Sequence, residues 1–435
     1  MADVRRQILA LARRHQAGKD REFVPGKTTV QYSGSVMGEA EVEALVGAVL
    51  DGWFGLAAKG RAFEQELARY LGVEHVLYTN SGSSANLIAV STLAQRMIHA
   101  HLKRGDEVVT PAATFPTTVF PLVQNGLVPV FVDAEPATLN ARPELIEEAI
   151  TEKTRLLMIP HTMGNPNDMT ALLRLKKEHG LFLIEDTCDA LGSTFRGQKM
   201  GTFGDLATTS FYPAHHITTG EGGAVFIPRG TQLQRTARSL RDWGRHCYCD
   251  TDEKDPMGAC GARFSFKIEG TPYDHKYMYS TVGYNLKPTE IQAALGLVQS
   301  RRIDEFGAAR RRNFALVQAR FKDHEDLFEL PRHHPEADPS WFAFWATVRE
   351  GAPFTRNELC EFLEGKRIQT RLVFAGNLVK QPVMRFVDYR VHGSLQGSDT
   401  IAARTFFVGV YPGLTIEMLE YIGDCLDEFV RTRAG

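Results

Sequence analysis

Four of the six cysteines in this sequence have spacings that could suit a metal centre. They follow the pattern C-x58-C-x-C-x10-C and are Cys188, Cys247, Cys249 and Cys260. Four thiolates can hold zinc or an iron–sulfur cluster, but a C-x-C pair is uncommon in structural zinc sites. The spacing therefore leaves zinc, a cluster and coincidence as comparable interpretations. The other two cysteines, Cys360 and Cys425, fall within helical patterns and are predicted to be core residues.

Polar residues follow short apolar segments at two other places in the chain. Ser81-Gly-Ser-Ser-Ala85 comes after the apolar segment 75–79, and small residues at a helix N-terminus suit a phosphate group. The same residues would also make an ordinary helix cap. Asp186 follows the apolar segment 181–185, where a carboxylate could hold a proton on a ligand's ring nitrogen or cap a helix. Both segments would place polar groups at the carboxyl edge of a sheet.

The elements that would position these residues alternate between helix and strand. The apolar patterns predict helices over 39–53, 61–71, 85–102, 117–124 and 169–179, and strands over 75–79, 108–111, 128–132, 156–160 and 181–185. Such alternation is typical of an α/β sheet. If strand geometry continued past residue 185, Cys188 and Asp186 would point the same way. After about residue 299, long charged helical stretches such as Arg310-Arg-Arg312 begin. We therefore predict a large domain over 1–300, preceded by an N-terminal helical arm, and a small C-terminal domain over 301–435.

The composition excludes several classes of partner. The chain has 435 residues, with 43% hydrophobic and 23% charged, as in an ordinary globular protein. Lys and Arg number 50 against 52 for Asp and Glu, so no basic excess points to nucleic acid or a membrane surface. The first fifteen residues form an amphipathic pattern without a long apolar core, which is neither a signal peptide nor a membrane span. We expect a cytoplasmic protein.

The segment from Ser210 to Gly223 carries a resemblance to a known family. It reads Ser-Phe-Tyr-Pro-Ala-His-His-Ile-Thr-Thr-Gly-Glu-Gly-Gly and resembles the Ser-Phe-x-x-x-Lys…Gly-Glu-Gly-Gly signature of the DegT/DnrJ/EryC1/StrS sugar aminotransferases. In that family the lysine forms an imine with pyridoxal phosphate. His215 stands at the lysine position, and an imidazole cannot form that imine but can move protons near neutral pH. The resemblance implies an α/β fold of the PLP-dependent transferase type I (aspartate aminotransferase-like), with a large mixed-sheet domain and a smaller C-terminal α+β domain.

The same resemblance implies roles for residues along the chain. The family's phosphate loop corresponds to Gly82, Ser83 and Ser84, and Ser210 corresponds to a further phosphate-binding serine. Asp186 matches the aspartate on the pyridine nitrogen, and Phe115 matches the aromatic residue that stacks on the ring. Asn285 matches an asparagine that reaches the phosphate from the neighbouring subunit, which implies a homodimer. Two residues that flank the site in sequence, Asp189 and Tyr212, are expected to contact the sugar.

One branch of this family, the 3-dehydratases, combines histidine-for-lysine with four cysteines that hold a [2Fe–2S] cluster. The similarity covers nearly the whole chain, including residues 242–249, 273–277, 371–377 and 411–415. It implies pyridoxamine 5'-phosphate (PMP) as cofactor, with the four cysteines named above as cluster ligands. His215 would be the base that takes the PMP methylene proton, so that the C3 hydroxyl leaves a nucleotide-linked 4-keto-6-deoxyhexose, with CDP-4-keto-6-deoxyglucose as the first expectation.

Replacing the C3 hydroxyl by hydrogen needs two electrons after this elimination. The chain has no G-x-G-x-x-G dinucleotide fingerprint between a strand and a helix, so a separate NAD(P)H-dependent reductase or ferredoxin is expected to supply them. Three alternatives stay open. They are a dTDP-4-keto-2,6-dideoxyhexose 3-dehydratase of the same mechanism, a cluster-free dehydratase that recycles its cofactor with glutamate, and an inactive homologue that binds a sugar nucleotide. Retention of Asp186, Phe115 and the phosphate loop argues against the last of these.

Overall fold

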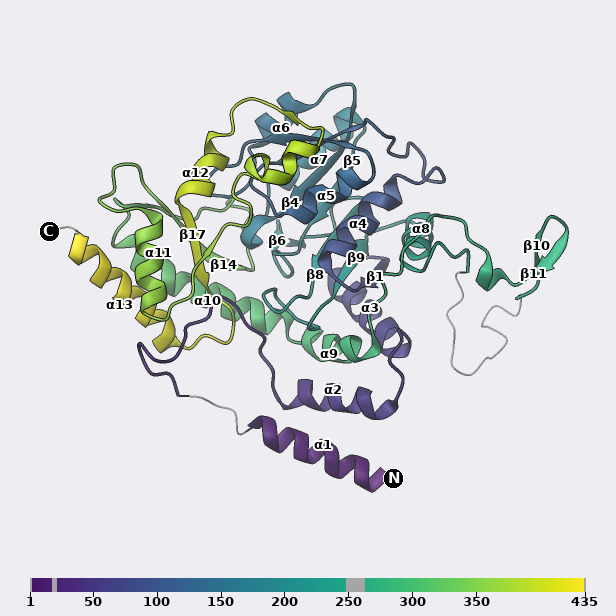
Figure 1. The fold of residues 1–435 in the computed structure, drawn as a ribbon, viewed down its shortest axis with the longest axis horizontal. Helices are drawn as coiled ribbons and strands as arrows, with labels where there is room; N and C mark the ends of the chain where they lie inside the picture. Colours follow the sequence, from purple (N-terminus) through teal and green to yellow (C-terminus); the bar gives the residue numbers. More distant parts are fainter. Residues whose placement is uncertain (1, 18–21, 248–262, 434–435) are drawn as a thin grey trace.

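The computed structural model describes residues 2–17, 22–247 and 263–433 (Figure 1), so Cys249 and Cys260 lie outside the described residues. Its centre is an eight-stranded sheet of order β1-β9-β8-β5-β4-β2-β3-β16. The strands are β1 (His75–Thr79), β2 (Glu107–Pro111), β3 (Val128–Val132), β4 (Thr154–Pro160), β5 (Phe182–Asp186), β8 (Leu206–Ser210), β9 (Gly223–Ile227) and β16 (Arg390–Val391). Neighbours pair in parallel except that β9 is antiparallel to both β1 and β8. The predicted large mixed sheet is confirmed.

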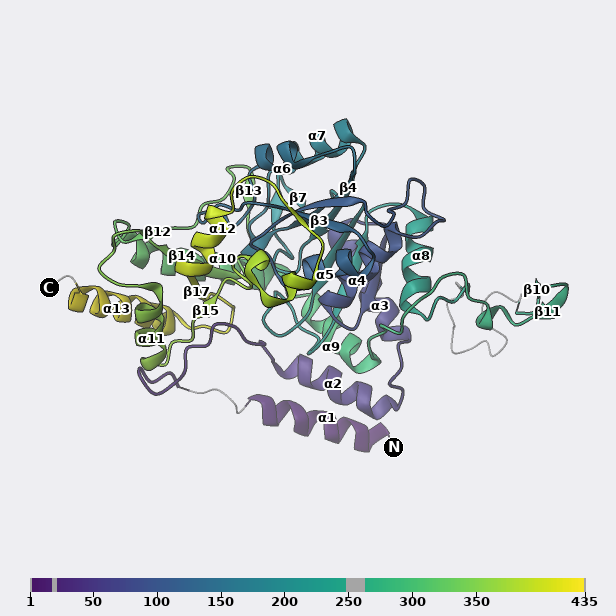
Figure 2. The same ribbon diagram turned by 45° about the horizontal axis from the view of Figure 1, so that its top comes forward.

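Helices cover both faces of this sheet. The two helix layers consist of α4 (Gly82–Leu93), α5 (Pro116–Gln124) and α8 (Thr231–Arg241) on one side and α6 (Pro143–Ala149) and α7 (Met169–His179) on the other (Figure 2). Successive residues of a strand point to opposite faces, so β4 sends Leu156 and Met158 into one core and Leu157 and Ile159 into the other. A sheet buried on both faces needs apolar residues at almost every position, which explains the continuous apolar segments in the sequence.

The N-terminal helices pack along one side of the body. They are α1 (Ala2–Ala17), α2 (Glu39–Asp51) and α3 (Ala58–Leu71), which are joined by α9 (Glu290–Ser300). Helix α1 contacts α2, and α2 and α3 both contact α9, so α1 lies outermost (Figures 1 and 2). No helix within the described ranges is long and apolar enough to cross a membrane.

The C-terminal part builds its own core around a second, four-stranded antiparallel sheet. This sheet contains β12 (Phe328–Glu329), β14 (Ala343–Val348), β15 (Arg371–Leu372) and β17 (Thr405–Gly409). It packs with α10 (Ile303–Lys322), α11 (Arg356–Gly365), α12 (Gln396–Arg404) and α13 (Ile416–Arg433). Cys425 is buried in this core and Cys360 packs against it, so the prediction of core cysteines is confirmed. Two C-terminal strands join sheets of the large part, because β16 pairs with β3 and β13 (Ala337–Asp338) pairs with β6 (Thr194–Phe195), which in turn pairs with β7 (Gln198–Lys199).

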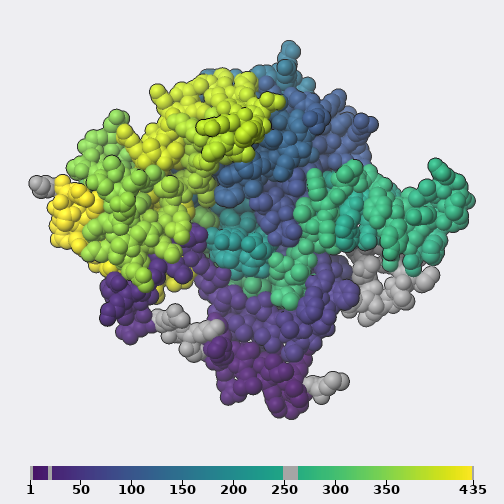
Figure 3. All heavy atoms as spheres, viewed as in Figure 1, coloured from purple at the N-terminus to yellow at the C-terminus, as the bar shows by residue number. Residues whose placement is uncertain are grey.

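A segment between α8 and α9 projects from the body. Its hairpin of β10 (Phe266–Ile268) and β11 (Thr271–Tyr273) lies beyond α8, on the right of Figures 1 and 2. The helical turn at His275–Tyr277 follows, and the chain then returns to the body. In the space-filling view the segment forms a separate lobe (Figure 3).

Candidate active site

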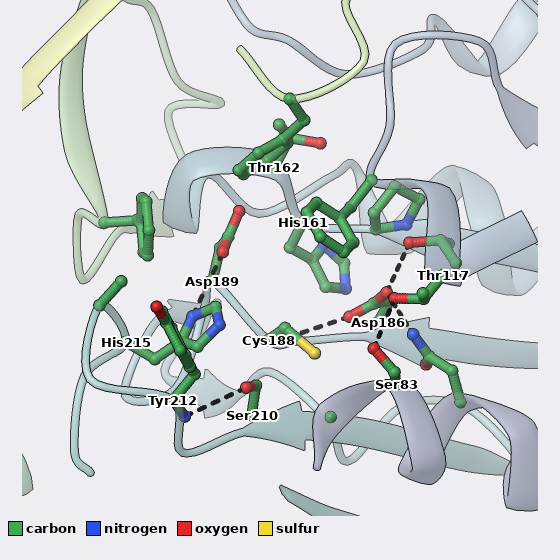
Figure 4. A pocket seen from close by; sticks show the side chains of 18 of the residues that line it. Ser83, Thr117, His161, Thr162, Asp186, Cys188, Asp189, Ser210, Tyr212 and His215 are labelled. Carbon is green, nitrogen blue, oxygen red and sulfur yellow. Dashed lines mark hydrogen bonds and ion pairs between the residues drawn. The ribbon is translucent and has the colours of Figure 1, made fainter. Parts of the chain in front are cut away.

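A cavity of about 400 Å³ opens at the carboxyl ends of the central strands (Figure 4). Its wall includes residues that follow β4, β5 and β8, the N-termini of α4 and α5, and part of β15. The carboxyl edge of an open α/β sheet is where ligands bind in this architecture. Most of the predicted site residues line it, namely Gly82, Ser83, Phe115, Asp186, Cys188, Asp189, Ser210, Tyr212 and His215.

Asp186 is the most firmly held of these residues. Its Oδ2 accepts hydrogen bonds from Asn86 Nδ2 at 2.9 Å and from Thr118 Oγ1 at 2.7 Å. Asn86 is itself oriented, because its side-chain oxygen accepts a 2.5 Å bond from Thr208 Oγ1. A carboxylate has about four acceptor sites, and Oδ1 accepts the backbone N–H of Cys188 at 3.1 Å. Asp186 therefore keeps acceptor capacity for a protonated ring nitrogen in the cavity.

Strand geometry does not continue from Asp186 to Cys188, so the condition for their expected alignment is not met. Strand β5 ends at Asp186, and the chain turns there because the Asp186 carboxylate binds the Cys188 N–H. Cys188 still reaches the same cavity. Burial raises the pKa of its thiol well above the ordinary value, and the charge of Asp186 adds to that shift. As a free side chain, Cys188 is thus a protonated thiol at neutral pH.

The turn before α4 forms a cradle of small residues. Ser81 caps the helix, accepting a bond from the Ser84 N–H at 3.1 Å. A Cβ at Gly82 would lie only 2.5 Å from Ser210 Cβ, so glycine is needed for this close approach. Ser83 Oγ donates to Thr117 Oγ1 at 3.0 Å, at the cavity wall. The cradle offers hydroxyls and a helix N-terminus to an anion, while Ser84 is engaged in the cap and does not line the cavity.

Phe115 and Tyr212 lie half-exposed at the cavity. Phe115 makes an edge-to-face contact with Phe374 at 5.5 Å between ring centroids, which leaves one of its faces for a ligand. A ligand that filled the cavity would bury much of its exposed area. This exposure is what a stacking residue shows before its ring partner is bound.

His215 is placed by its backbone and by one carboxylate. Its N–H donates to Tyr212 O at 2.9 Å, and its carbonyl accepts from Arg310 Nη2 at 2.9 Å. Its ring packs against Phe342 at 5.4 Å, and its Nδ1 faces Asp189 Oδ1 at 3.5 Å (Figure 4). That distance is longer than an ordinary hydrogen bond, but such contacts in ligand-free enzymes often tighten when substrate binds. An Nδ1–H directed at Asp189 leaves the lone pair of Nε2 as the proton acceptor.

Burial sets the protonation states of this pair. It lowers the pKa of His215 to about 4, with Arg310 adding to the effect and Asp186 opposing it. Burial also raises the pKa of Asp189 to about 7, and the negative charge of Asp186 raises it further, while the Met163 N–H and Arg310 oppose the shift. The His215 imidazole is therefore neutral at pH 7, as a base must be.

The neighbouring histidine has a different environment. His216 is buried outside the cavity that contains Asp186, and its Nε2 lies 2.7 Å from the carbonyl oxygen of Ser340. Burial lowers its pKa well below the ordinary value. Of the two adjacent imidazoles, only His215 lines the cavity.

Several residues of the site were missed in the sequence. Asn86 and Thr118 hold Asp186 from positions far away in the chain, and no local pattern marks them. His161 directly follows β4 and lines the cavity. Ligands bind at the carboxyl ends of strands in an open α/β sheet, and this rule, which pointed to Asp186, also pointed to His161. Its Nδ1 accepts the Asn167 N–H at 3.1 Å. Arg371 contributes a guanidinium to the cavity and stacks over the Tyr32 ring.

Two predicted site residues lie elsewhere. Cys247 lines a second cavity, together with residues of α3, β1 and α8. Asn285 also stays outside the first cavity, and its side-chain oxygen accepts a 2.8 Å bond from Lys287 Nζ. Within one chain, neither residue meets Asp186 or His215. Asn285 was expected to act on a neighbouring subunit, and this remains a prediction.

We predict that activity falls at acidic pH because Asp189 becomes protonated, and not because His215 does. The Asp189 carboxylate is charged above its raised pKa of about 7 and loses that charge as pH falls through this value. Activity should therefore decline below pH 7, although His215 stays neutral down to about pH 4. Asp189→Asn should lower kcat about tenfold to 100-fold and flatten this decline, measured as kcat between pH 5 and 9. An unchanged acidic limb in the variant would exclude Asp189 as its source.

Comparison with known proteins agrees with this arrangement. Residues 36–427 match the model of the DegT/DnrJ/EryC1/StrS aminotransferase family. The chain is 47% identical over 432 residues to lipopolysaccharide biosynthesis protein RfbH of Salmonella typhimurium, covering 98% of each chain. It is 48% identical to dTDP-4-dehydro-2,6-dideoxy-D-glucose 3-dehydratase of Saccharopolyspora spinosa, covering 98% of this chain and 92% of that one.

A solved structure shows the same fold. The E. coli GDP-4-keto-6-deoxy-D-mannose 3-dehydratase with bound hydrated PLP aligns with a TM-score of 0.82 at 26% identity, covering 91% of this chain and 99% of the other. The predicted fold, that of the PLP-dependent aminotransferases with a large mixed sheet and a smaller antiparallel one, is confirmed. This chain belongs to the DegT/DnrJ/EryC1/StrS aminotransferase family.

Proposed function

We propose that this protein is a nucleotide-sugar 3-dehydratase that removes the C3 hydroxyl of a 4-keto-6-deoxyhexose with PMP as cofactor. One observation supports this proposal above all. His215 occupies the lysine position of the family signature, and it lines the cavity beside Asp189. The described residues that line the cavity include no lysine, so none of them could hold the cofactor as an imine. One of the two relatives reported above is named a 3-dehydratase.

The residues present fit PMP. The Gly82–Ser83 turn, the α4 N-terminus and Ser210 suit a phosphate, and Gly82 leaves the room that a Cβ would fill. Asp186 has acceptor capacity for the ring nitrogen, and Phe115 offers an aromatic face. When bound, PMP would supply an amine for the sugar ketone and a ring that withdraws electrons. His215 would accept the proton from the cofactor's methylene carbon at Nε2, and Asp189 would stabilise the charged imidazolium.

The substrate is proposed to be CDP-4-keto-6-deoxyglucose, with a dTDP-linked 4-keto-2,6-dideoxyhexose as the second candidate. The first candidate follows from the resemblance to the CDP-sugar branch of the 3-dehydratases, and the second is supported by the 48% identity to a dTDP-sugar 3-dehydratase. Arg371 offers a cation for the diphosphate, and Asp189 and Tyr212 are the proposed sugar contacts. The test is incubation with PMP and CDP-, dTDP- or GDP-linked ketosugars labelled with oxygen-18 at C3. Label released into water supports the proposal, and no release from any of them contradicts it.

We further propose that the active protein is a homodimer that receives electrons from a separate NAD(P)H-dependent reductase or ferredoxin through a [2Fe–2S] cluster. The proposed ligands are Cys188, Cys247, Cys249 and Cys260. Cys188 lies in the cavity with Asp186, where an electron carrier would be needed. Cys247 lines the second cavity, beside residues of α3, β1 and α8.

The cysteine assignment makes its own prediction. Cys247→Ser should remove most of the bound iron and block reduction of the product, while oxygen-18 release continues at near the wild-type rate. The reason is that Cys247 lies away from His215 and Asp186, so the proton-transfer step does not need it. Iron content and visible absorbance are the measurements. Cys360→Ser is the matched control, because Cys360 packs against the C-terminal core and should keep full iron. Full iron in Cys247→Ser would make the ligand assignment wrong.

A further inference from the structure

We propose that Tyr32 is a positioning residue for the substrate, because its ring holds the Arg371 guanidinium where it can bind the diphosphate of a sugar nucleotide. The inference rests on the proposed function, since it concerns how that nucleotide-linked substrate is bound. Tyr32 lines the cavity from a segment that precedes the match to the family model, which begins at residue 36. The N-terminal segment would thus help to bind the substrate from outside the matched region.

The charges that line the cavity decide where a diphosphate can lie. Its acidic side chains are Asp186, Asp189 and Glu221, and Arg371 is the one arginine or lysine among the described residues that line it. A diphosphate is repelled by carboxylates and attracted by a guanidinium, most strongly where little water screens the charges. A guanidinium also offers paired N–H donors that match phosphate oxygens. The diphosphate should therefore lie at the Arg371 end of the cavity.

A row of aromatic rings connects the proposed cofactor site with this end. Neighbouring rings lie 5.5 to 6.4 Å apart between centroids, in the order Phe115, Phe374, Phe342, Phe407 and Tyr32. All five residues line the cavity. His215 packs against Phe342, in the middle of the row. A substrate with its hexose beside His215 can therefore extend its diphosphate past Phe407 toward Tyr32 and Arg371.

The Arg371 side chain lies flat over the Tyr32 ring. The distance from Arg371 Cζ to the ring centroid is 4.3 Å, which is a cation–π contact. Its Nη1 donates to the Thr370 carbonyl oxygen at 2.6 Å and lies 3.7 Å from Glu364 Oε1. Both contacts use Nη1, so the N–H groups on Nη2 and Nε can turn to an anion. A guanidinium that a ring already holds loses less conformational freedom when it binds.

Tyr32 is itself held by backbone hydrogen bonds to the C-terminal part. The Val30 N–H donates to Arg367 O at 2.9 Å, and the Gln369 N–H donates to Val30 O at 2.9 Å. The Tyr32 N–H donates to Gln369 Oε1 at 3.3 Å. The N-terminal segment therefore runs alongside the residues that lead into β15, the strand that begins with Arg371.

Strand β17 fixes the ring and the guanidinium relative to each other. A Cβ at Gly409 would lie 2.5 Å from the Tyr32 carbonyl oxygen, so glycine is needed for the close approach of this segment to β17. Arg371 pairs with Phe407 of the same strand, and the Phe407 ring contacts the Tyr32 ring edge-to-face. Tyr32 and Arg371 therefore reach the cavity wall from one rigid support.

Calorimetry with CDP, dTDP and GDP as probes measures this site without turnover. In the PMP-loaded protein, Arg371→Leu should weaken binding of the preferred nucleotide about 10- to 100-fold, as expected for a lost hydrogen bond to a charged group. Tyr32→Leu should weaken it about three- to tenfold, because a cation–π contact contributes less. PMP affinity should stay within about threefold of wild type in both variants, because Asp186 and Phe115 keep their contacts.

The double variant tests whether Tyr32 acts through Arg371. If it does, the double variant should bind within about twofold of Arg371→Leu alone. Tyr32→Phe keeps the ring and should bind like the wild type. Arg433→Leu is the matched control, because Arg433 also stacks on a ring, that of Phe429 at 5.5 Å, but does not line the cavity. Its nucleotide affinity should be unchanged.

The outcomes separate this inference from the proposed function. Wild-type affinity in Tyr32→Leu, or additive losses in the double variant, would overturn the role of Tyr32 and leave the nucleotide-sugar enzyme in place. A loss in Tyr32→Phe as large as that in Tyr32→Leu would also overturn it, since the hydroxyl and not the ring would then matter. A wild type that binds none of the three nucleotides would reject the nucleotide-linked substrate itself. Melting temperature and bound PMP establish that each variant is folded.

Discussion

Replacing His215 by asparagine is expected to lower the rate of C3 oxygen release by about 1000-fold while leaving PMP affinity within about threefold of wild type. Asparagine has no lone pair of comparable basicity, so no group in that position can accept the methylene proton. The PMP site should persist, because His215 is positioned by its backbone bonds to Tyr212 and Arg310, which asparagine retains. The measurements are oxygen-18 release and exchange of the PMP methylene hydrogen with solvent deuterium.

The neighbouring histidine provides the control. His216→Asn removes a buried ring whose Nε2 lies 2.7 Å from Ser340 O, so it should lower the melting temperature. It should leave the rate per folded molecule within a few-fold of wild type, because His216 does not line the cavity with Asp186. If His215→Asn exchanged the methylene hydrogen at the wild-type rate, another residue would be the base.

Most strands of the large sheet could be predicted from the sequence, because each strand depends on a local pattern of apolar residues. Strands at His75–Thr79 and Val128–Val132 and the helix Met169–His179 have the predicted bounds. The prediction of a helix to residue 102 is wrong, because α4 ends at Leu93 and the following turns bring the Leu102 N–H back to Leu93 O. Apolar residues continue through that stretch, so the periodicity gave no sign of the end. Ala100, with φ of 54°, takes a left-handed conformation that no glycine signalled.

The site was predictable where a residue's place depends on its own strand. The position of Asp186 can be predicted from the end of β5 alone. Its partners Asn86 and Thr118 come from the helices α4 and α5, so their positions depend on tertiary packing. Arg310 is a stronger example. Its segment reads as an exposed charged helix, yet it is buried and donates to the carbonyls of Trp341, Phe342 and His215. Burial lowers its pKa to about 10, so it stays charged at neutral pH and helps keep the nearby His215 neutral.

Replacing Asp186 by asparagine should weaken PMP binding about tenfold to 100-fold and lower oxygen-18 release by at least about 100-fold. A hydrogen bond to a charged group contributes about 1.5–3 kcal/mol, and an amide cannot hold the proton on the ring nitrogen as a carboxylate does. Asparagine has nearly the shape of aspartate, so its amide oxygen can keep both bonds that Oδ2 accepts, from Asn86 and Thr118, while its NH2 group replaces the acceptor Oδ1. PMP affinity by equilibrium dialysis and the absorbance of the bound cofactor report the two effects separately.

Asp205→Asn is the matched control, because Asp205 precedes the next strand, β8, at the opposite edge of the sheet. It accepts the Leu183 N–H at 2.8 Å and pairs with Lys176 at 2.8 Å. Its loss should reduce stability without changing PMP affinity, since it lies outside the cavity. Comparing the two variants thus distinguishes Asp205, whose carboxylate has a structural role, from Asp186, whose unused acceptor sites face a ligand. Wild-type affinity and unchanged absorbance in Asp186→Asn would mean that the ring nitrogen is not bound by Asp186, and that the cofactor is held differently from this proposal.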